Sequence, residues 1–234
     1  MKWLRTLVLF DKGNVISSSD WQTIHESYVR AILSIDHPVG SGSLKLKRKT
    51  RLPNSQWSRN GVGYLRSRFL GHMKGAEGWQ AEGNVDLGRD RVQPPIKLYP
   101  SLESYREPIT SDFGGFDFVT TAPSGTKVAI EWETGNISSS HRSMNKLAIA
   151  LGNGIVQAGV LILPSRNLYE HLTDRIGNIG ELSGYLSMWE SLKSSVERGL
   201  MAVTVVEHDA LTDDASFPYL PMGNDGRARE GRAK

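Results

Sequence analysis

Hydrophobic and polar residues alternate most clearly in two neighbouring runs, 116–120 and 128–134. Pro123-Ser124-Gly125 lies between them and is typical of a tight turn, so the two runs are predicted to form a β-hairpin. Successive side chains of a strand point to opposite faces. Glu131 and Glu133 therefore share one face of the second strand, and the apolar residues beside them share the other.

Longer hydrophobic patterns predict the rest of the fold. Apolar residues that recur every three or four positions indicate amphipathic helices. These helices are expected at about 20–35, 60–73, 143–151 and 182–192, with a shorter one at 168–172. Near-continuous apolar runs at 156–163 and 200–206 are typical of strands buried on both faces. Strands interleaved with helices predict an α/β fold with a central mixed β-sheet flanked by helices.

Residues 83–112 interrupt this order, because they are rich in Gly, Pro and mixed charge. They are predicted to form a long loop that leads back into the sheet. A length of 234 residues suits one domain, 1–234, with a sizeable core. We expect its last part, about 218–234, to be a basic arm that is mobile when no partner is bound.

Composition narrows the class of protein. The net charge is only +3, but the pI is about 9.1 and basic residues cluster, so an anionic partner would meet local patches. Cysteine is absent, which excludes disulfides and thiolate metal sites. The apolar run at 6–10 is too short for a signal peptide, and no run could span a bilayer. A cytoplasmic protein without a membrane partner is the expectation.

The predicted hairpin also carries the candidate chemistry. With a suitable register, Asp117 on the first strand would lie beside Glu131 and Glu133. Three carboxylates this close repel one another unless a counter-charge is present, and a divalent cation with oxygen ligands is the usual one. The alternative is an edge strand whose scattered acids face solvent.

A polar helix start follows the second strand directly. Gly135 ends the strand, and Asn136, Ser138 and Arg142 would then lie near the carboxylates. Arg and Asn side chains are the ones that read guanine and adenine in the major groove. Taken alone, a helix start rich in Ser and Asn is more often a capped helix and nothing more.

Residues 133–147, Glu-Thr-Gly-Asn-Ile-Ser-Ser-Ser-His-Arg-Ser-Met-Asn-Lys-Leu, together with Glu131 and the later Leu-Thr-Asp-Arg-Ile at 172–176, closely resemble the BamHI family of type II restriction endonucleases. The similarity is strong from about 128 to 190. It is weaker around 60–82 and 221–226, and we leave the first fifty residues unaligned. The match is far longer than any single short motif.

The resemblance implies a restriction-endonuclease-like core of the PD-(D/E)xK type that hydrolyses DNA with Mg²⁺, for which Mn²⁺ substitutes. Asp117, Glu131 and Glu133 would be the catalytic set. Glu82 would join Asp117 and Glu131 as a metal ligand. Asp112 is a rival for the place of Asp117, although Gly-Gly-Phe-Asp at 114–117 fits the family pattern better.

The resemblance also implies a homodimer on double-stranded DNA, with the palindrome GGATCC cut after its first G. The residues that match DNA-contacting positions are Asn136, Ser138, Arg142, Asp174, Arg175, Arg66, Gly223 and Asp225. Restriction would require a companion methyltransferase to protect the host genome. An endonuclease of the same fold with a different site, or a DNA-binding protein that does not cut, are the alternatives.

Three local questions stay open at this stage. The apolar residues of 143–151 could form the dimer seam or pack in the core. The basic run at 45–51 could contact phosphates or be a solvated face. Asp174 and Arg175 could form a simple surface ion pair.

Overall fold

The computed structural model describes residues 1–83, 96–97, 99–100, 104–105, 115–173 and 176–221. Its main sheet has six strands in the order β1-β11-β10-β9-β8-β5. In that order the strands are Lys2–Lys12, Gly199–Glu207, Ala158–Pro164, Lys127–Trp132, Phe116–Thr121 and Gln80–Gly83. The middle strands β9, β10 and β11 are parallel, and the strands at both edges are antiparallel to their neighbours. The predicted mixed sheet is confirmed.

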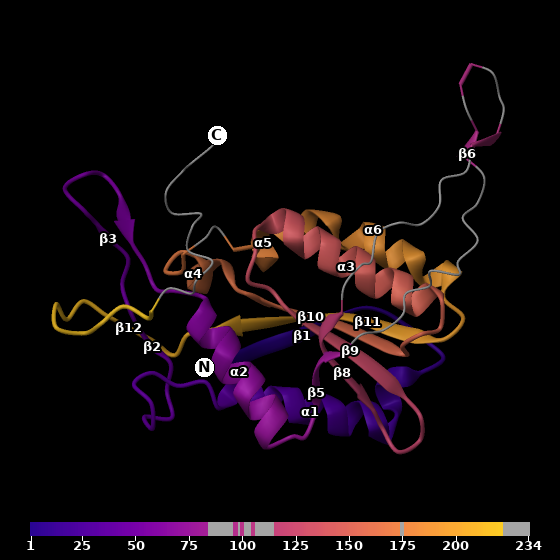
Figure 1. Ribbon diagram of the computed structural model, residues 1–234, viewed down its shortest axis with the longest axis horizontal. Helices are drawn as coiled ribbons and strands as arrows, with labels where there is room; N and C mark the ends of the chain where they lie inside the picture. The colour runs from indigo at the N-terminus through magenta and orange to yellow at the C-terminus, as the bar shows by residue number, and fades with distance from the viewer. Residues whose placement is uncertain (84–95, 98, 101–103, 106–114, 174–175, 222–234) are drawn as a thin grey trace.

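Helices cover both faces of this sheet (Figure 1). One face packs against α1 (Ser19–Leu33), α2 (Gly63–Gly75) and α4 (Arg166–Tyr169). The opposite face packs against α3 (Ile137–Gly152), α5 (Ile179–Leu182) and α6 (Leu186–Glu190). Two hydrophobic cores result, one on each side of the sheet.

The remaining elements are short. They are η1 (Val15–Ser17), β2 (Lys45–Lys47), β3 (Thr50–Arg51), β4 (Trp57–Ser58), β6 (Ile96–Lys97), β7 (Ser104–Tyr105), η2 (Ser183–Tyr185), η3 (Ser191–Ser195) and β12 (Ala210–Thr212). β2 pairs with β12, β3 with β4 and β6 with β7. Most of the predicted loop at 83–112 lies outside the described residues. No helix in the described ranges is long and apolar enough to cross a membrane.

Strand β9 separates the two cores. Ile130 and Trp132 belong to the core under α1 and α2, whereas Ala129 belongs to the core under α3. Glu131 has the same parity as Ala129, so its side chain points to the α3 side. All seven residues of β10 are buried, as the apolar run predicted. The register of β9 thus determines which core receives the carboxylates.

The helix expected from residue 60 begins instead at Gly63. Asn60 is extended, because its backbone pairs with residues 171–173: its N–H donates to His171 O, and its carbonyl accepts from Thr173 N. These long-range hydrogen bonds override the helical pattern. The expected helix at 182–192 is also broken, into α5, η2, α6 and η3.

Serines explain the broken helix. Ser183 Oγ donates to Gly180 O, Ser191 Oγ to Met188 O and Ser195 Oγ to Leu192 O. Such local hydrogen bonds compete with the helical ladder. The apolar stripe still serves its expected purpose, since Leu182 and Trp189 are fully buried in the second core.

The apolar face of α3 packs inside the chain. Met144, Leu147 and Leu151 are at most 1% exposed and belong to the core between α3 and the sheet. Of the two readings of this face, core packing is confirmed. These residues are not available to a second subunit.

Candidate active site

The β8–β9 pairing brings Asp117 to Glu131. Phe118 pairs with Ile130, so Asp117 and Glu131 are the next positions along the two strands. The carboxylate of Asp117 also accepts a hydrogen bond from the backbone N–H of Trp132 at 2.7 Å. On the other side of β8, Ala81 pairs with Phe118 and Gly83 with Phe116, which places Glu82 at the backbone position beside Asp117. Three of the four predicted catalytic positions therefore lie on adjacent strands.

Two cationic side chains approach this set from opposite faces of the sheet. Arg66 on α2 pairs with Asp117, with Nη2 2.5 Å from Oδ1. Lys146 on α3 pairs with Glu131, and its Nζ also donates to Gly115 O at 2.8 Å. Lys146 is only 8% exposed. A lysine this buried has to be paired, which gives it a direct part in the charge of the site.

Sequence reasoning did not single out Lys146. A signal was available, because Lys146 lies four residues before Ala150, which is buried, so both residues occupy the inward face of the helix. A lysine predicted on an apolar face is a reason to look for a carboxylate partner.

Glu133 lies just beyond β9 and is 4% exposed. Its Oε1 accepts a hydrogen bond from Gly135 N at 2.6 Å. Its Oε2 is buried and has no hydrogen bond to any described residue. Burial raises the pKa of Glu133 to about 7, against the opposing effect of the Ser140 hydroxyl and the Gly135 and Thr134 amides. Glu133 can therefore hold or release a proton near neutral pH.

The pKa of Glu131 is also raised to about 7. Burial is the main cause, and the negative charges of Asp117 and Glu133 act in the same direction. The ammonium of Lys146 opposes this rise. Without further positive charge, the site therefore resists full ionisation.

A hard divalent cation would suit the chemistry of these groups, which offer carboxylate oxygens and one buried oxygen without a donor. Within the described residues, no three Asp, Glu, His or Cys side chains form a group that could hold a metal ion. Arg66 and Lys146 neutralise two of the carboxylates in this state. The donor type fits a cation such as Mg²⁺, and Mg²⁺ itself stays a prediction.

The start of α3 is fixed beside the carboxylates by a close backbone crossing. Gly177 N donates to Gly135 O at 2.9 Å. A Cβ on Gly135 would lie 2.7 Å from Ser139 Cβ, and one on Gly177 would overlap the Ser140 hydroxyl. Glycine is therefore required at 135, whereas a larger residue at 177 would need the Ser140 hydroxyl to rotate away. Asn136 is the N-cap, with Oδ1 accepting from Ser138 N and Ser139 N, so the capping role is confirmed.

The residues predicted to contact DNA fall into three groups. Asn136, Ser138 and Arg142 are exposed at the first two turns of α3, where a duplex can reach them. Arg66 is half-buried and paired with Asp117, while its contact with DNA stays a prediction. The other four, Asp174, Arg175, Gly223 and Asp225, lie outside the described residues, as does Asp112.

The residues on either side of Asp174 and Arg175 are described, and both are anchored. Thr173 N donates to Asn60 O at 2.8 Å, and Ile176 pairs with Asn136. The segment that carries the predicted Asp-Arg pair is thus attached on one side to Asn60 and on the other to the helix start. Ile176 and the start of α3 therefore lie side by side.

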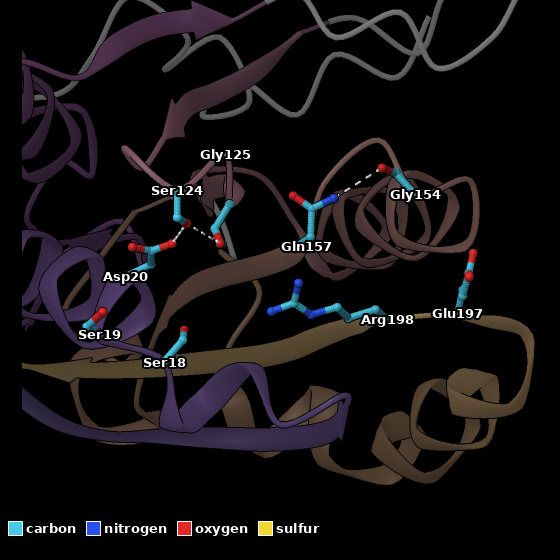
Figure 2. A pocket seen from close by; sticks show the side chains of 10 residues that line it. Ser18, Ser19, Asp20, Ser124, Gly125, Gly154, Gln157, Glu197 and Arg198 are labelled. Atoms are coloured by element: carbon cyan, nitrogen blue, oxygen red, sulfur yellow. Dashed lines mark hydrogen bonds between the residues drawn. The ribbon is translucent and has the colours of Figure 1, made fainter.

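A polar hollow of about 680 Å³ lies at the opposite strand ends (Figure 2). Asp20, Ser124, Gln157 and Arg198 line it, and Ser124 donates to Asp20. Gln157 and Arg198 immediately precede β10 and β11, whereas the carboxylates stand near the end of β9. The hollow is therefore separate from the candidate active site.

The sequence is similar to known proteins along nearly its whole length. The family described as restriction endonuclease BamHI matches residues 1–227. The type II restriction enzyme OkrAI of Oceanobacter kriegii is 32% identical over 228 residues, which cover 97% of this chain and 99% of that one. The type II restriction enzyme BamHI of Bacillus amyloliquefaciens is 33% identical over 224 residues, covering 96% and 92%.

A solved structure supports the fold. The crystal structure of restriction endonuclease BglII complexed with a DNA 16-mer superimposes with a TM-score of 0.56, covering 95% of this chain and 88% of that one at 9% identity. At such low identity the likeness concerns the fold alone, which is that of a restriction endonuclease.

Proposed function

Because this chain belongs to the BamHI family of restriction endonucleases, and is thus a type II restriction enzyme, we propose that it hydrolyses double-stranded DNA at GGATCC, after the first G, with Mg²⁺. The observation that carries the proposal is the position of Asp117 and Glu131 on paired strands, next to the exposed start of α3. The family resemblance in the sequence is confirmed by the whole-chain match.

The carboxylates have distinct roles in this proposal. Asp117 and Glu131, with Glu82 at the adjacent backbone position, would hold Mg²⁺, which when bound neutralises charge that develops on the phosphate. Mn²⁺ offers similar coordination and would substitute. Arg66 and Lys146 keep these carboxylates neutralised when no cation is present.

Glu133 is the group we assign to the attacking water. Its Oε2 is free of hydrogen bonds to described residues, and its pKa of about 7 suits a proton acceptor near neutral pH. The Gly135 amide holds the other carboxylate oxygen, which orients Oε2. Glu133 would thus take a proton from the water as the phosphodiester is attacked.

Asn136, Ser138 and Arg142 would read bases in the major groove together with Asp174 and Arg175. Arg66 would contact DNA beside Asp117, and Gly223 and Asp225 in the C-terminal arm would approach the minor groove. A palindrome is read by a two-fold dimer, so we propose a homodimer. Its surface lies elsewhere than Met144, Leu147 and Leu151, which are buried.

The test is cleavage of a plasmid that contains one GGATCC site, followed by mapping of both ends. We expect a single cut on each strand after the first G with Mg²⁺ or Mn²⁺, and none in EDTA. Glu133→Lys should retain DNA binding and lose most turnover. Wild-type turnover in that variant would contradict the role of Glu133.

Other outcomes distinguish the alternatives. Discrete cuts at another sequence would mean the same fold with a different specificity, and binding without cuts would mean a DNA-binding protein. A restriction enzyme acts where the DNA is, so the proposal also places the protein in the cytoplasm beside a companion methyltransferase.

A further inference from the structure

Asn60 is a fully buried side chain that holds three separate parts of the chain. Its Nδ2 donates to Lys47 O at 2.8 Å and to His171 O at 3.0 Å. Its Oδ1 accepts from Leu220 N at 3.2 Å. It is 0% exposed and lies between β4 and α2. Both amide hydrogens and one acceptor position are therefore used, which is close to all that an asparagine can offer.

The backbone of the same residue reinforces two of these attachments. Asn60 N donates to His171 O at 2.8 Å, and Thr173 N donates to Asn60 O at 2.8 Å. The next residue, Gly61, donates its N–H to Leu220 O at 3.0 Å. Residues 171–173 and Leu220 are thus fixed to one two-residue unit of the chain.

The sequence that continues from each attachment point is the important feature. Asp174 and Arg175 follow Thr173 directly, and Gly223 and Asp225 lie three and five residues after Leu220. Arg66 lies six residues after Asn60 on α2. Each of these segments carries residues assigned to DNA in the proposed function. Each of them adjoins Asn60 or a residue that is hydrogen-bonded to Asn60.

We propose that Asn60 is a positioning residue that fixes residues 171–173 and Leu220 relative to each other, and so determines how strictly the enzyme discriminates its site. The inference rests on the proposed function for its effect on DNA. Asn60 contacts no DNA itself, since its side chain is buried.

The chemistry of the amide explains why asparagine stands here. A buried donor or acceptor that loses its partner is costly. Asn60→Ala removes the side-chain partner of Lys47 O and of Leu220 N, and leaves His171 O with the backbone N–H of residue 60 as its donor. Asn60→Asp keeps the acceptor for Leu220 N and can make at most one of the two donor contacts to Lys47 O and His171 O, and that one only when the carboxyl is protonated. The two variants therefore separate the attachments. Both should loosen the 171–173 segment, but only alanine should also release Leu220.

Thr204→Val is the matched control. Thr204 is 0% exposed on β11, and its hydroxyl bonds to Thr6 at 2.9 Å and Tyr28 at 3.2 Å, away from Asn60. The Thr204→Val substitution also removes a buried polar group, so it should lower the free energy of unfolding about as much as Asn60→Ala does. Any effect shared with this control is a general loss of stability.

Hydrogen exchange of the full-length protein without DNA is the first readout. Relative to the amide of Leu161 in β10, exchange at Thr173 and Leu220 should be faster by about tenfold or more in Asn60→Ala and unchanged in Thr204→Val. Asn60→Asp should accelerate Thr173 and leave Leu220 near wild type. Unchanged ratios in Asn60→Ala would overturn the proposal, whether or not the protein cuts DNA.

Discrimination is the second readout. The ratio of kcat/KM for GGATCC to that for a duplex with one outer base pair changed should fall by about tenfold in Asn60→Ala and by less than about twofold in Thr204→Val. Equal ratios in the two variants would overturn the effect on specificity. If the wild type cuts neither duplex, the proposed function fails, and hydrogen exchange still decides the positioning role.

Discussion

Replacing Glu133 by Gln should stabilise the metal-free protein at alkaline pH while abolishing its activity. Glu133 is 4% exposed, and its pKa is raised from 4.5 to about 7, mainly by burial. Glutamine keeps an oxygen that can accept from Gly135 N, as Oε1 does now. It removes the charge and preserves the shape.

The size and pH range of the effect follow from this pKa. Below about pH 4.5 the carboxyl is protonated in both the folded and the unfolded chain, so Gln and Glu should differ little. As the pH rises to 7, the unfolded chain ionises first, and the folded protein loses stability. A difference between pKa 4.5 and about 7 corresponds to about 3 kcal/mol, which should be reached above pH 7.

Urea unfolding in EDTA between pH 4.5 and 8.5 measures this difference. Glu133→Gln should equal wild type at the acid end and exceed it by up to about 3 kcal/mol at pH 8.5. Glu190 is exposed on α6, so Glu190→Gln should stay within about 0.5 kcal/mol of wild type throughout. A gain for Glu133→Gln that does not vary with pH would refute burial of the charge as its cause.

Three further substitutions test other parts of the structure. Lys146→Met should destabilise the metal-free protein at pH 8 by about 3–5 kcal/mol, because it leaves Glu131 buried without its ion pair. Urea unfolding in EDTA should show a smaller loss of stability at pH 5, and an equal loss at both pH values would contradict the pairing. Leu147→Ala should lower the free energy of unfolding by about 2–5 kcal/mol at every protein concentration, whereas a seam residue would give a loss that varies with concentration. Asn136→Ala should cost about 1 kcal/mol through loss of the α3 cap, and Asn136→Ser should restore most of that stability in thermal unfolding but not DNA cleavage; restored cleavage would leave capping as its whole role.

Local patterns were sufficient wherever a single element decides the outcome. Periodicity predicts the β8–β9 hairpin, α1 and the buried strands β10 and β11, because the spacing of apolar residues within each element identifies its buried face. Strand β1 was not predicted. It lies at the edge of the sheet, and only one of its eleven residues is buried, so its hydrophobic signal is weak.

Contacts between segments far apart in the sequence were harder to predict from the sequence. The pairing of Glu131 with Lys146 joins β9 to α3. The inward position of Lys146 indicates a carboxylate partner, but the local sequence does not identify Glu131 as that partner. Asn60 was placed in a helix because the apolar pattern after it is helical, whereas its partners are at 171–173 and 220. Residue types thus indicated the candidate chemistry, and tertiary contacts determined how its charges are balanced.

The register of β9 has a consequence for how enzymes of this architecture can vary. Glu131 faces α3 only because an odd number of steps separates it from Ile130 and Trp132, which fill the opposite core. A single residue inserted in β9 before Glu131 would turn Glu131 into the core under α1 and α2 and turn Trp132 toward the scissile phosphate. Changes in length are therefore tolerable in the 122–126 turn and forbidden a few positions later, so descendants of this scaffold can exchange their surface loops freely while the spacing within that strand stays fixed.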